Sequence, residues 1–169
     1  GCTNPCRSMA ASSSVDADDI VLSVDLTNPD VEQGEGRALA RGQLHVYRSR
    51  FLHHDMAIER IRVSNFGLKR IETVLTLLAD SDFADVFEVR GVRSGRTQGR
   101  ARRPRIEASR VVFGYFGQDE LLRETIIDLD PPPRVAAAVD DRVRVDWEVE
   151  IEAGGEREIL VVAAPTTAG

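Results

Sequence analysis

A two-residue alternation of apolar and polar side chains recurs along this chain and constrains its fold more than any other feature. Successive side chains of a β-strand point to opposite faces of a sheet, so this period predicts strands. The first example lies in residues 18–27, whose apolar members are Ile20, Leu22, Val24 and Leu26. Residues 43–51 and 56–66 repeat the pattern and predict a hairpin. Its connecting turn is expected at His53-His54-Asp55, and Asn65-Phe66-Gly67 is expected to close it with a second turn.

Five more strands are predicted downstream, separated by Gly-, Asp- and Pro-rich turns. They cover residues 70–79, 106–115, 121–130, 142–151 and 156–163. Residues 70–79 could also form a short helix, but their Val, Ile and Thr content favours a strand. No convincing helical period is found. The pattern therefore predicts an all-β antiparallel β-sandwich, supersandwich-like, with few or no helices.

The chain's 169 residues are enough for one domain with a buried core. Residues 1–17 are small, polar and aperiodic, so they are expected to form a disordered leader or an artificial tail, with a single β-sandwich domain over 18–169. Cys2 and Cys6 both lie in that leader and could bind a metal, form a small disulfide ring, or do neither. The cysteine-free body fits a cytoplasmic protein, and no apolar run is long enough to span a membrane.

The charge pattern argues against a nucleic-acid partner. The chain carries a net charge of −6, and Lys69 is the only lysine among 22 basic residues. Residues 91–106 hold six arginines and no acid, but they contain no aromatic residues on which bases could stack. This stretch is therefore predicted to be a solvated loop, or a loop that faces an acidic neighbour.

Residues 80–91 mix acidic and aromatic side chains. The acids are Asp80, Asp82, Asp85 and Glu88, interleaved with Phe83 and Phe87. They could supply a glycosidase-type carboxylate pair, or they could form a solvated loop that caps the sheet. The two phenylalanines would anchor the segment to the core or dock it against a partner. His53 and His54 are expected to be exposed turn residues rather than metal ligands, and Trp147 is expected in the core.

Several segments together resemble the N-terminal domain of bacterial glycogen debranching enzymes of the amylo-α-1,6-glucosidase type. The most specific is LADSDFADVFEVRG (78–91). It is supported by SVDLTNPD (23–30), by the hairpin over 41–67, and by FGYFGQDELLRETIIDLDPPP (113–133). The resemblance covers about residues 18–163.

The resemblance implies a non-catalytic domain that packs on and supports a helical toroid, in which the catalytic carboxylates hydrolyse α-1,6 linkages of α-glucans. It implies no catalytic residue, metal or cofactor in this chain, whose parent protein would be a glycoside hydrolase. The alternative is an autonomous α-glucan-binding module. Nothing in residues 1–17 matches the extra strands that open the family domain. An unpaired edge strand could therefore pair two copies into a homodimer.

The acidic-aromatic segment is where the residue pattern and the resemblance meet. Its members are predicted to contact either the toroid or glucan. They are Asp80, Asp82, Phe83, Asp85, Phe87, Glu88 and Arg90. Phe83 and Phe87 would anchor the segment, the acids would face sugar hydroxyls or arginines, and Arg90 would pair with these acids.

Overall fold

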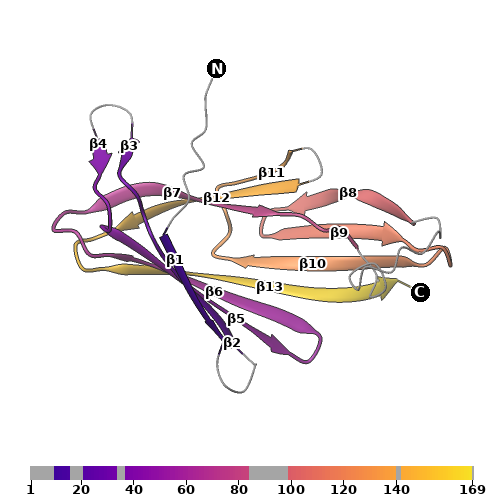
Figure 1. Cartoon of the computed structure of the whole chain (residues 1–169). Helices are drawn as coiled ribbons and strands as arrows, with labels where there is room; N and C mark the ends of the chain where they lie inside the picture. The colour runs from indigo at the N-terminus through magenta and orange to yellow at the C-terminus, as the bar shows by residue number, and fades with distance from the viewer. Residues whose placement is uncertain (1–9, 16–20, 34–36, 84–98, 140–141, 169) are drawn as a thin grey trace. The chain divides into compact units, whose positions relative to one another are not determined.

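Strands and turns account for the described part of the chain, and Figure 1 shows no helix in it. The computed structural model describes residues 10–15, 21–33, 37–83, 99–139 and 142–168. The strands are β1 (Ala10–Val15), β2 (Val21–Thr27), β3 (Val31–Gln33), β4 (Arg37–Leu39), β5 (Leu44–His53), β6 (Met56–Asn65), β7 (Ile71–Ala79), β8 (Arg100–Glu107), β9 (Arg110–Phe116), β10 (Leu122–Asp130), β11 (Val135–Val139), β12 (Arg142–Ile151) and β13 (Glu156–Ala168). The predicted all-β antiparallel sandwich is confirmed.

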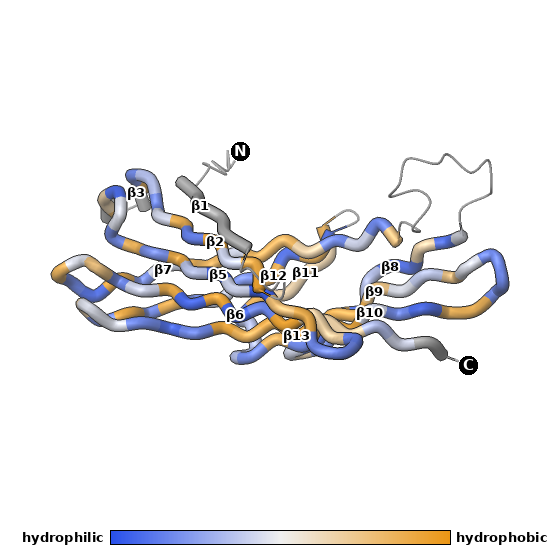
Figure 2. The backbone as a smooth tube through the Cα atoms, turned by 60° about the horizontal axis from the view of Figure 1, so that its bottom comes forward, coloured by the Kyte–Doolittle hydropathy of each residue, from blue (hydrophilic) through white to orange (hydrophobic). Residues whose placement is uncertain are grey.

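The chain divides into two compact units. The first comprises Gly1–His53, Ala57–Thr73 and Glu148–Val161, and the second comprises His54–Met56, Val74–Trp147 and Val162–Gly169. Strands β7, β12 and β13 therefore contribute residues to both units. Along the strands, apolar and polar residues alternate, which Figure 2 shows as a change between orange and blue along the tube.

In the first unit, hydrogen bonds order the strands β1-β2-β5-β6-β13, and β3 pairs with β4 in a small separate sheet. Strand β2 runs antiparallel to β5, with Asp25 opposite Tyr47 and Thr27 opposite His45. The alternation buries one face and leaves the other to solvent. The buried side chains include Leu44, Val46, Ile61, Val63, Val149, Ile151 and Ile159.

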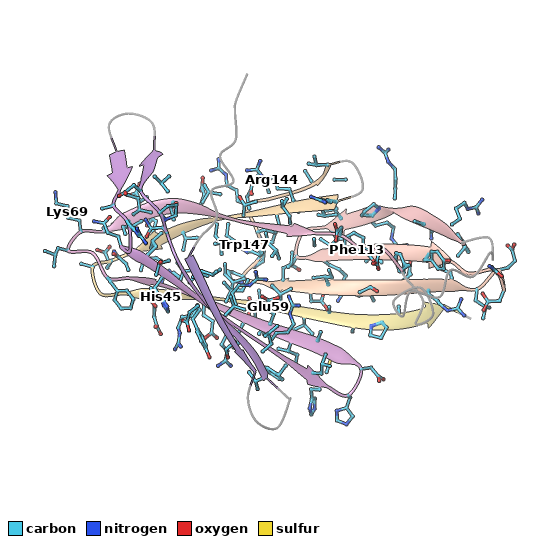
Figure 3. The ribbon with its side chains drawn as sticks, in the orientation of Figure 1. His45, Glu59, Lys69, Phe113, Arg144 and Trp147 are labelled. Carbon is cyan, nitrogen blue, oxygen red and sulfur yellow. The ribbon has the colours of Figure 1, made fainter. Side chains whose placement is uncertain are left out.

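In the second unit, one sheet has the order β13-β10-β9-β8 and the other has the order β11-β12-β7. The core of this unit includes Val111, Val112, Phe113, Leu129, Val143, Val145 and Trp147. Trp147 is buried, as predicted, and its indole nitrogen donates a hydrogen bond to the carbonyl of Pro131 at 2.8 Å. Arg144 lies on the opposite side of β12 from Trp147 (Figure 3).

Four strands lie where the sequence predicted none. Strand β1 lies within the segment predicted as a tail, and it pairs with β2 over its whole length. Strands β3 and β4 are short and pair with each other between the first two predicted strands, and β11 follows the three prolines at 131–133. A strand of only a few residues shows too few alternations to be recognised from the sequence. Its formation depends on pairing with a neighbouring strand, which the local sequence pattern does not reveal.

The prediction for the arginine-rich stretch was wrong over residues 100–105, which belong to strand β8 (Arg100–Glu107) rather than to a loop. The predicted strand over 106–115 is correspondingly divided, because its first residues end β8 and the rest begin β9. Strand β8 ends the strand order of its sheet, and its register shifts at a bulge between Arg102 and Arg105. Charged residues, a proline and a bulge are typical of edge strands, and they hide the usual alternation.

Both predicted turns of the long hairpin are confirmed. His54 adopts a left-handed conformation with φ of 52°, and the side chains of His53 and His54 are exposed. Asn65, Phe66 and Gly67 link β6 to β7. Among the described residues, no helix is long and apolar enough to cross a membrane.

Candidate functional sites

The structure describes the predicted acidic-aromatic segment as far as Phe83. Asp80 forms an ion pair with Arg142 at 3.2 Å, with both side chains exposed, and Asp82 is exposed. The other predicted contact residues, Asp85, Phe87, Glu88 and Arg90, lie outside the described residues. Asp80 therefore has an ion-pair partner within its own chain.

Phe83 is held against strand β9. Its ring stacks on Tyr115 with a centroid distance of 5.1 Å and an interplanar angle of 16°. The Tyr115 hydroxyl in turn accepts a hydrogen bond from the backbone N–H of Gly99 at 2.6 Å. Gly99 passes so close to Tyr115 and to the backbone of Phe116 that a Cβ atom there would clash. The phenylalanine ring thus packs against a residue of its own unit.

The outer face of the β11-β12-β7 sheet, here called the open face, exposes a group of aliphatic side chains. Cross-strand pairing and the contact of Thr76 with Asp146 place alternate residues of all three strands on this side. The exposed aliphatic residues are Val74, Leu78, Val135 and Val139, each exposed by 44–53%. Asp80 follows them on the same side of β7, so the predicted contact segment begins at the end of the open face.

Hydrogen-bonded polar groups lie between these aliphatic side chains. Asp146 accepts hydrogen bonds from the Thr76 hydroxyl at 2.7 Å and from Nε of Arg144 at 2.9 Å. Burial by itself would raise the pKa of Asp146, but these two hydrogen bonds and the charge of Arg144 outweigh it and lower that pKa below its ordinary value. The open face therefore combines exposed aliphatic side chains with hydrogen-bonded and ion-paired polar groups that lie between them.

The arginines of β8 are engaged within their own sheet. Arg102 and Arg105 approach Glu124 of β10 at 4.0 and 2.8 Å. Arg100 and Arg102 also lie over the ring of Phe116, with the guanidinium carbon 5.4 and 5.7 Å from the ring centroid. These contacts give the arginines a structural role in covering an edge strand, which a pattern of basic residues alone does not show.

A buried asparagine organises the turn between β6 and β7. The side-chain amide of Asn65 donates hydrogen bonds to the carbonyls of Lys69, Ile151 and Glu152 at 2.8, 3.0 and 3.1 Å. Its side-chain oxygen accepts one from the N–H of Gly67 at 2.8 Å, and the N–H of Phe66 bonds to the carbonyl of Gln43. The backbone of this turn is thereby fixed, while the side chain of Phe66 is 68% exposed.

Next to this turn, the solvent-facing side of β2, β5 and β6 carries a line of polar and aromatic side chains. His45 contacts the Phe66 ring at a centroid distance of 5.7 Å, and its Nε2 lies 2.8 Å from the carboxylate of Asp25. Two residues along β5, the Tyr47 hydroxyl is 2.9 Å from that of Ser23, and Arg62 lies over the Tyr47 ring. His45 and Lys69 are labelled in Figure 3.

The opposite face of these strands holds a compact charge cluster. Glu59 of β6 is buried, and its carboxylate accepts hydrogen bonds from Arg48 and Arg50 of β5. Such charge-assisted contacts compensate the desolvation of a buried carboxylate. With both oxygens bound by guanidinium groups, Glu59 has a structural role. No group of metal-ligating side chains occurs within the ranges that the structure describes.

Residues 2–162 match the family model for the N-terminal domain of some glycogen debranching enzymes. The chain belongs to this family. The match spans almost the whole chain, so the resemblance read from the segment around residues 78–91 is confirmed. No curated protein sequence matches this debranching-enzyme domain.

Solved structures resemble this domain at low sequence identity, and one of them has a TM-score above 0.5 among those described below. A protein from the human microbiome, provisionally named a kojibiose phosphorylase, matches with a TM-score of 0.60 and 11% identity over 88% of the domain. A similarly provisional aldose 1-epimerase from Escherichia coli K12 has a TM-score of 0.49 and 9% identity, covering 94% of this chain and 69% of its own. A polysaccharide lyase has a TM-score of 0.49 and 8% identity, over 92% of this chain and 23% of its own. The debranching-enzyme domain spans only 18% of the kojibiose phosphorylase chain.

Sequence reasoning did not select Phe66 or Asn65 of this domain as functional candidates. The signal available was the Asn-Phe-Gly turn, which predicts a change of direction and nothing about exposure. The turn is fixed by hydrogen bonds from the Asn65 side chain to the carbonyls of Ile151 and Glu152, which are remote in sequence. The exposure of Phe66 depends on this tertiary arrangement of the turn.

Proposed function

We propose that this chain is a non-catalytic domain that packs on and supports a helical toroid catalytic domain, which hydrolyses α-1,6 linkages of α-glucans. The observation that carries the proposal is the open face, with Val74, Leu78, Val135 and Val139 exposed on one side of a sheet. Grouped aliphatic side chains of this kind are typical of a surface that another protein covers. Family membership supplies the partner, since the matched model describes an N-terminal domain of glycogen debranching enzymes.

The described acids support a non-catalytic role. A glycosidase needs one carboxyl group that donates a proton and a second that acts as a base or nucleophile across the scissile bond. Asp80 is paired with Arg142, Glu59 with two arginines, and Asp146 with Arg144 and Thr76. In the proposal, catalysis belongs to the toroid, and the open face together with the segment that starts at Asp80 forms the contact with it.

The proposal is tested by mixing this chain with a separately produced debranching-enzyme catalytic domain and measuring complex formation by titration calorimetry. Leu78→Asp places a charge among the aliphatic side chains of the open face and is expected to weaken the complex at least tenfold, or roughly 1.4 kcal/mol. Leu52→Asp is the matched control, because Leu52 is an exposed leucine of β5 away from that face. Equal binding by both variants and the unchanged chain would contradict the proposed contact.

A second candidate function is an autonomous α-glucan-binding module, and the exposed ring of Phe66 is the observation that favours it.

Two further predictions also await tests. One is pairing of two copies through β1, whose outer edge pairs with no other described strand. The other is location in the cytoplasm.

A further inference from the structure

Phe66 differs from the other aromatic side chains within the described residues, because it alone is exposed to solvent. Phe51 is half-buried, and the remaining ones each have a partner or a buried position. Trp147 and Phe113 are in the core, Phe83 and Tyr115 stack on each other, Arg100 and Arg102 cover Phe116, and Arg62 covers Tyr47. Burial of a phenylalanine side chain stabilises a protein, so this domain forgoes much of that stabilisation at residue 66.

The exposed ring is also held in place. The Asn65 side chain and the Phe66 N–H anchor the turn to three other parts of the first unit: Gln43 just before β5, Lys69, and the end of β12 at residues 151 and 152. A ring on a fixed backbone loses little conformational freedom when a ligand covers it, which favours affinity. Leu68, on the same turn, is 95% exposed and aliphatic, so it provides an internal comparison.

Hydrogen-bonding groups adjoin one edge of the ring. His45 contacts Phe66, and the half-exposed carboxylate of Asp25 contacts His45. Beyond them along the strands, Tyr47, Ser23 and Arg62 continue the line. Asp25 and Arg62 carry opposite charges, so the surface has no excess charge that would select a phosphate or an acidic peptide.

We propose that Phe66, His45 and Asp25 form a binding site for an α-glucan chain. The apolar C–H face of a sugar ring lies on Phe66, and sugar hydroxyls hydrogen-bond to the Asp25 carboxylate and the His45 imidazole. A neutral, polyhydroxylated ligand matches both the single apolar ring and the balanced charges beside it. The inference rests on the proposed function in one respect, since the debranching-enzyme family supplies the class of glucan.

The test is calorimetric titration of the full 169-residue chain with maltoheptaose, together with electrophoresis through gels that contain glycogen. Phe66→Ala is expected to weaken binding about tenfold, and Phe66→Trp to retain or tighten it, because tryptophan offers a larger flat face. Leu68→Ala is the matched control and is expected to bind like the unchanged chain. Asp25→Asn, which keeps the shape but removes the charged acceptor, is expected to weaken binding severalfold.

Each outcome decides the inference. Loss in Phe66→Ala and Asp25→Asn, with binding kept in Leu68→Ala and Phe66→Trp, supports it. Absence of glucan binding by the unchanged chain overturns it, as does equal binding by the unchanged chain and Phe66→Ala. If Phe66→Ala fails to fold, as judged by circular dichroism, Asp25→Asn carries the decision. None of these results affects complex formation through the open face, so failure of this site and failure of the proposed packing role are distinguishable.

Discussion

Replacing Asn65 with alanine removes the side chain that connects the Phe66 turn to the rest of the first unit. Asn65 is fully buried, and its amide and oxygen serve the carbonyls of Lys69, Ile151 and Glu152 and the N–H of Gly67. An amide has two N–H donors, so one of them is shared between two carbonyls, and the substitution removes about three conventional hydrogen bonds.

The magnitude follows from those three bonds. A typical intramolecular hydrogen bond contributes about 1 kcal/mol net, and a group left buried without a partner costs about 1–3 kcal/mol. The turn lies at the surface, so water can reach part of the freed backbone. We therefore expect the free energy of unfolding to fall by about 2–4 kcal/mol. For a domain of this size, the melting temperature should then drop by roughly 5–12 °C.

Thermal and urea unfolding followed by circular dichroism measures the loss, and amide hydrogen exchange at Gly67 locates it. Ser64→Ala is the control, because Ser64 is a half-buried neighbour on the same strand, and it should change stability by less than about 0.5 kcal/mol. A loss in Asn65→Ala no larger than in this control, with unchanged exchange at Gly67, would refute the reasoning.

Two more substitutions test the charged groups. Glu59→Gln leaves two guanidinium groups without their carboxylate and should lower the free energy of unfolding by about 1–3 kcal/mol. Glu158→Gln is the control, because Glu158 is in an exposed ion pair, and it should change the free energy of unfolding by less than about 0.5 kcal/mol. Equal effects of the two substitutions in urea unfolding would contradict the structural role given to Glu59. Because the native pKa of Asp146 lies below its ordinary value of 3.8, its ionised form stabilises the fold above that value, and this contribution is lost as pH falls through the lowered native pKa. The stability difference between the unchanged chain and Asp146→Asn should therefore be largest near neutral pH and shrink in acid, and a difference independent of pH between about 7 and 2 would show that the carboxylate charge is not responsible.

The strands that were predicted well are those with one buried and one exposed face. Strands β6 and β12 show the clearest alternation, because every second side chain along much of their length enters a core. The observed ranges of β2, β5, β6 and β12 all lie close to the predicted ones. Strand β8 was missed because an edge strand rich in arginine, with a bulge beside Pro104, carries no such pattern. Strand β1 was missed because six small residues pair only when β2 is present beside them.

The candidate sites were predicted less completely than the strands. Asp80 and Phe83 were chosen for their chemistry, and the structure adds their partners Arg142 and Tyr115, which no local pattern names. The open face was not predicted, because the exposure of Val74 or Leu78 depends on which side of the sheet is covered. The roles proposed for the predicted contact residues remain predictions.

The sequence by itself determined the fold class and the family, because alternation, turn residues and the segment around residues 78–91 are all local features. The tertiary structure alone decided which side chains are exposed and which polar groups are satisfied. Asn65 shows the reason most clearly, since its hydrogen-bond partners Ile151 and Glu152 lie 86 and 87 residues away along the chain. A turn motif predicts where the backbone reverses, but only contacts of that range bury the asparagine and leave the phenylalanine beside it in solvent.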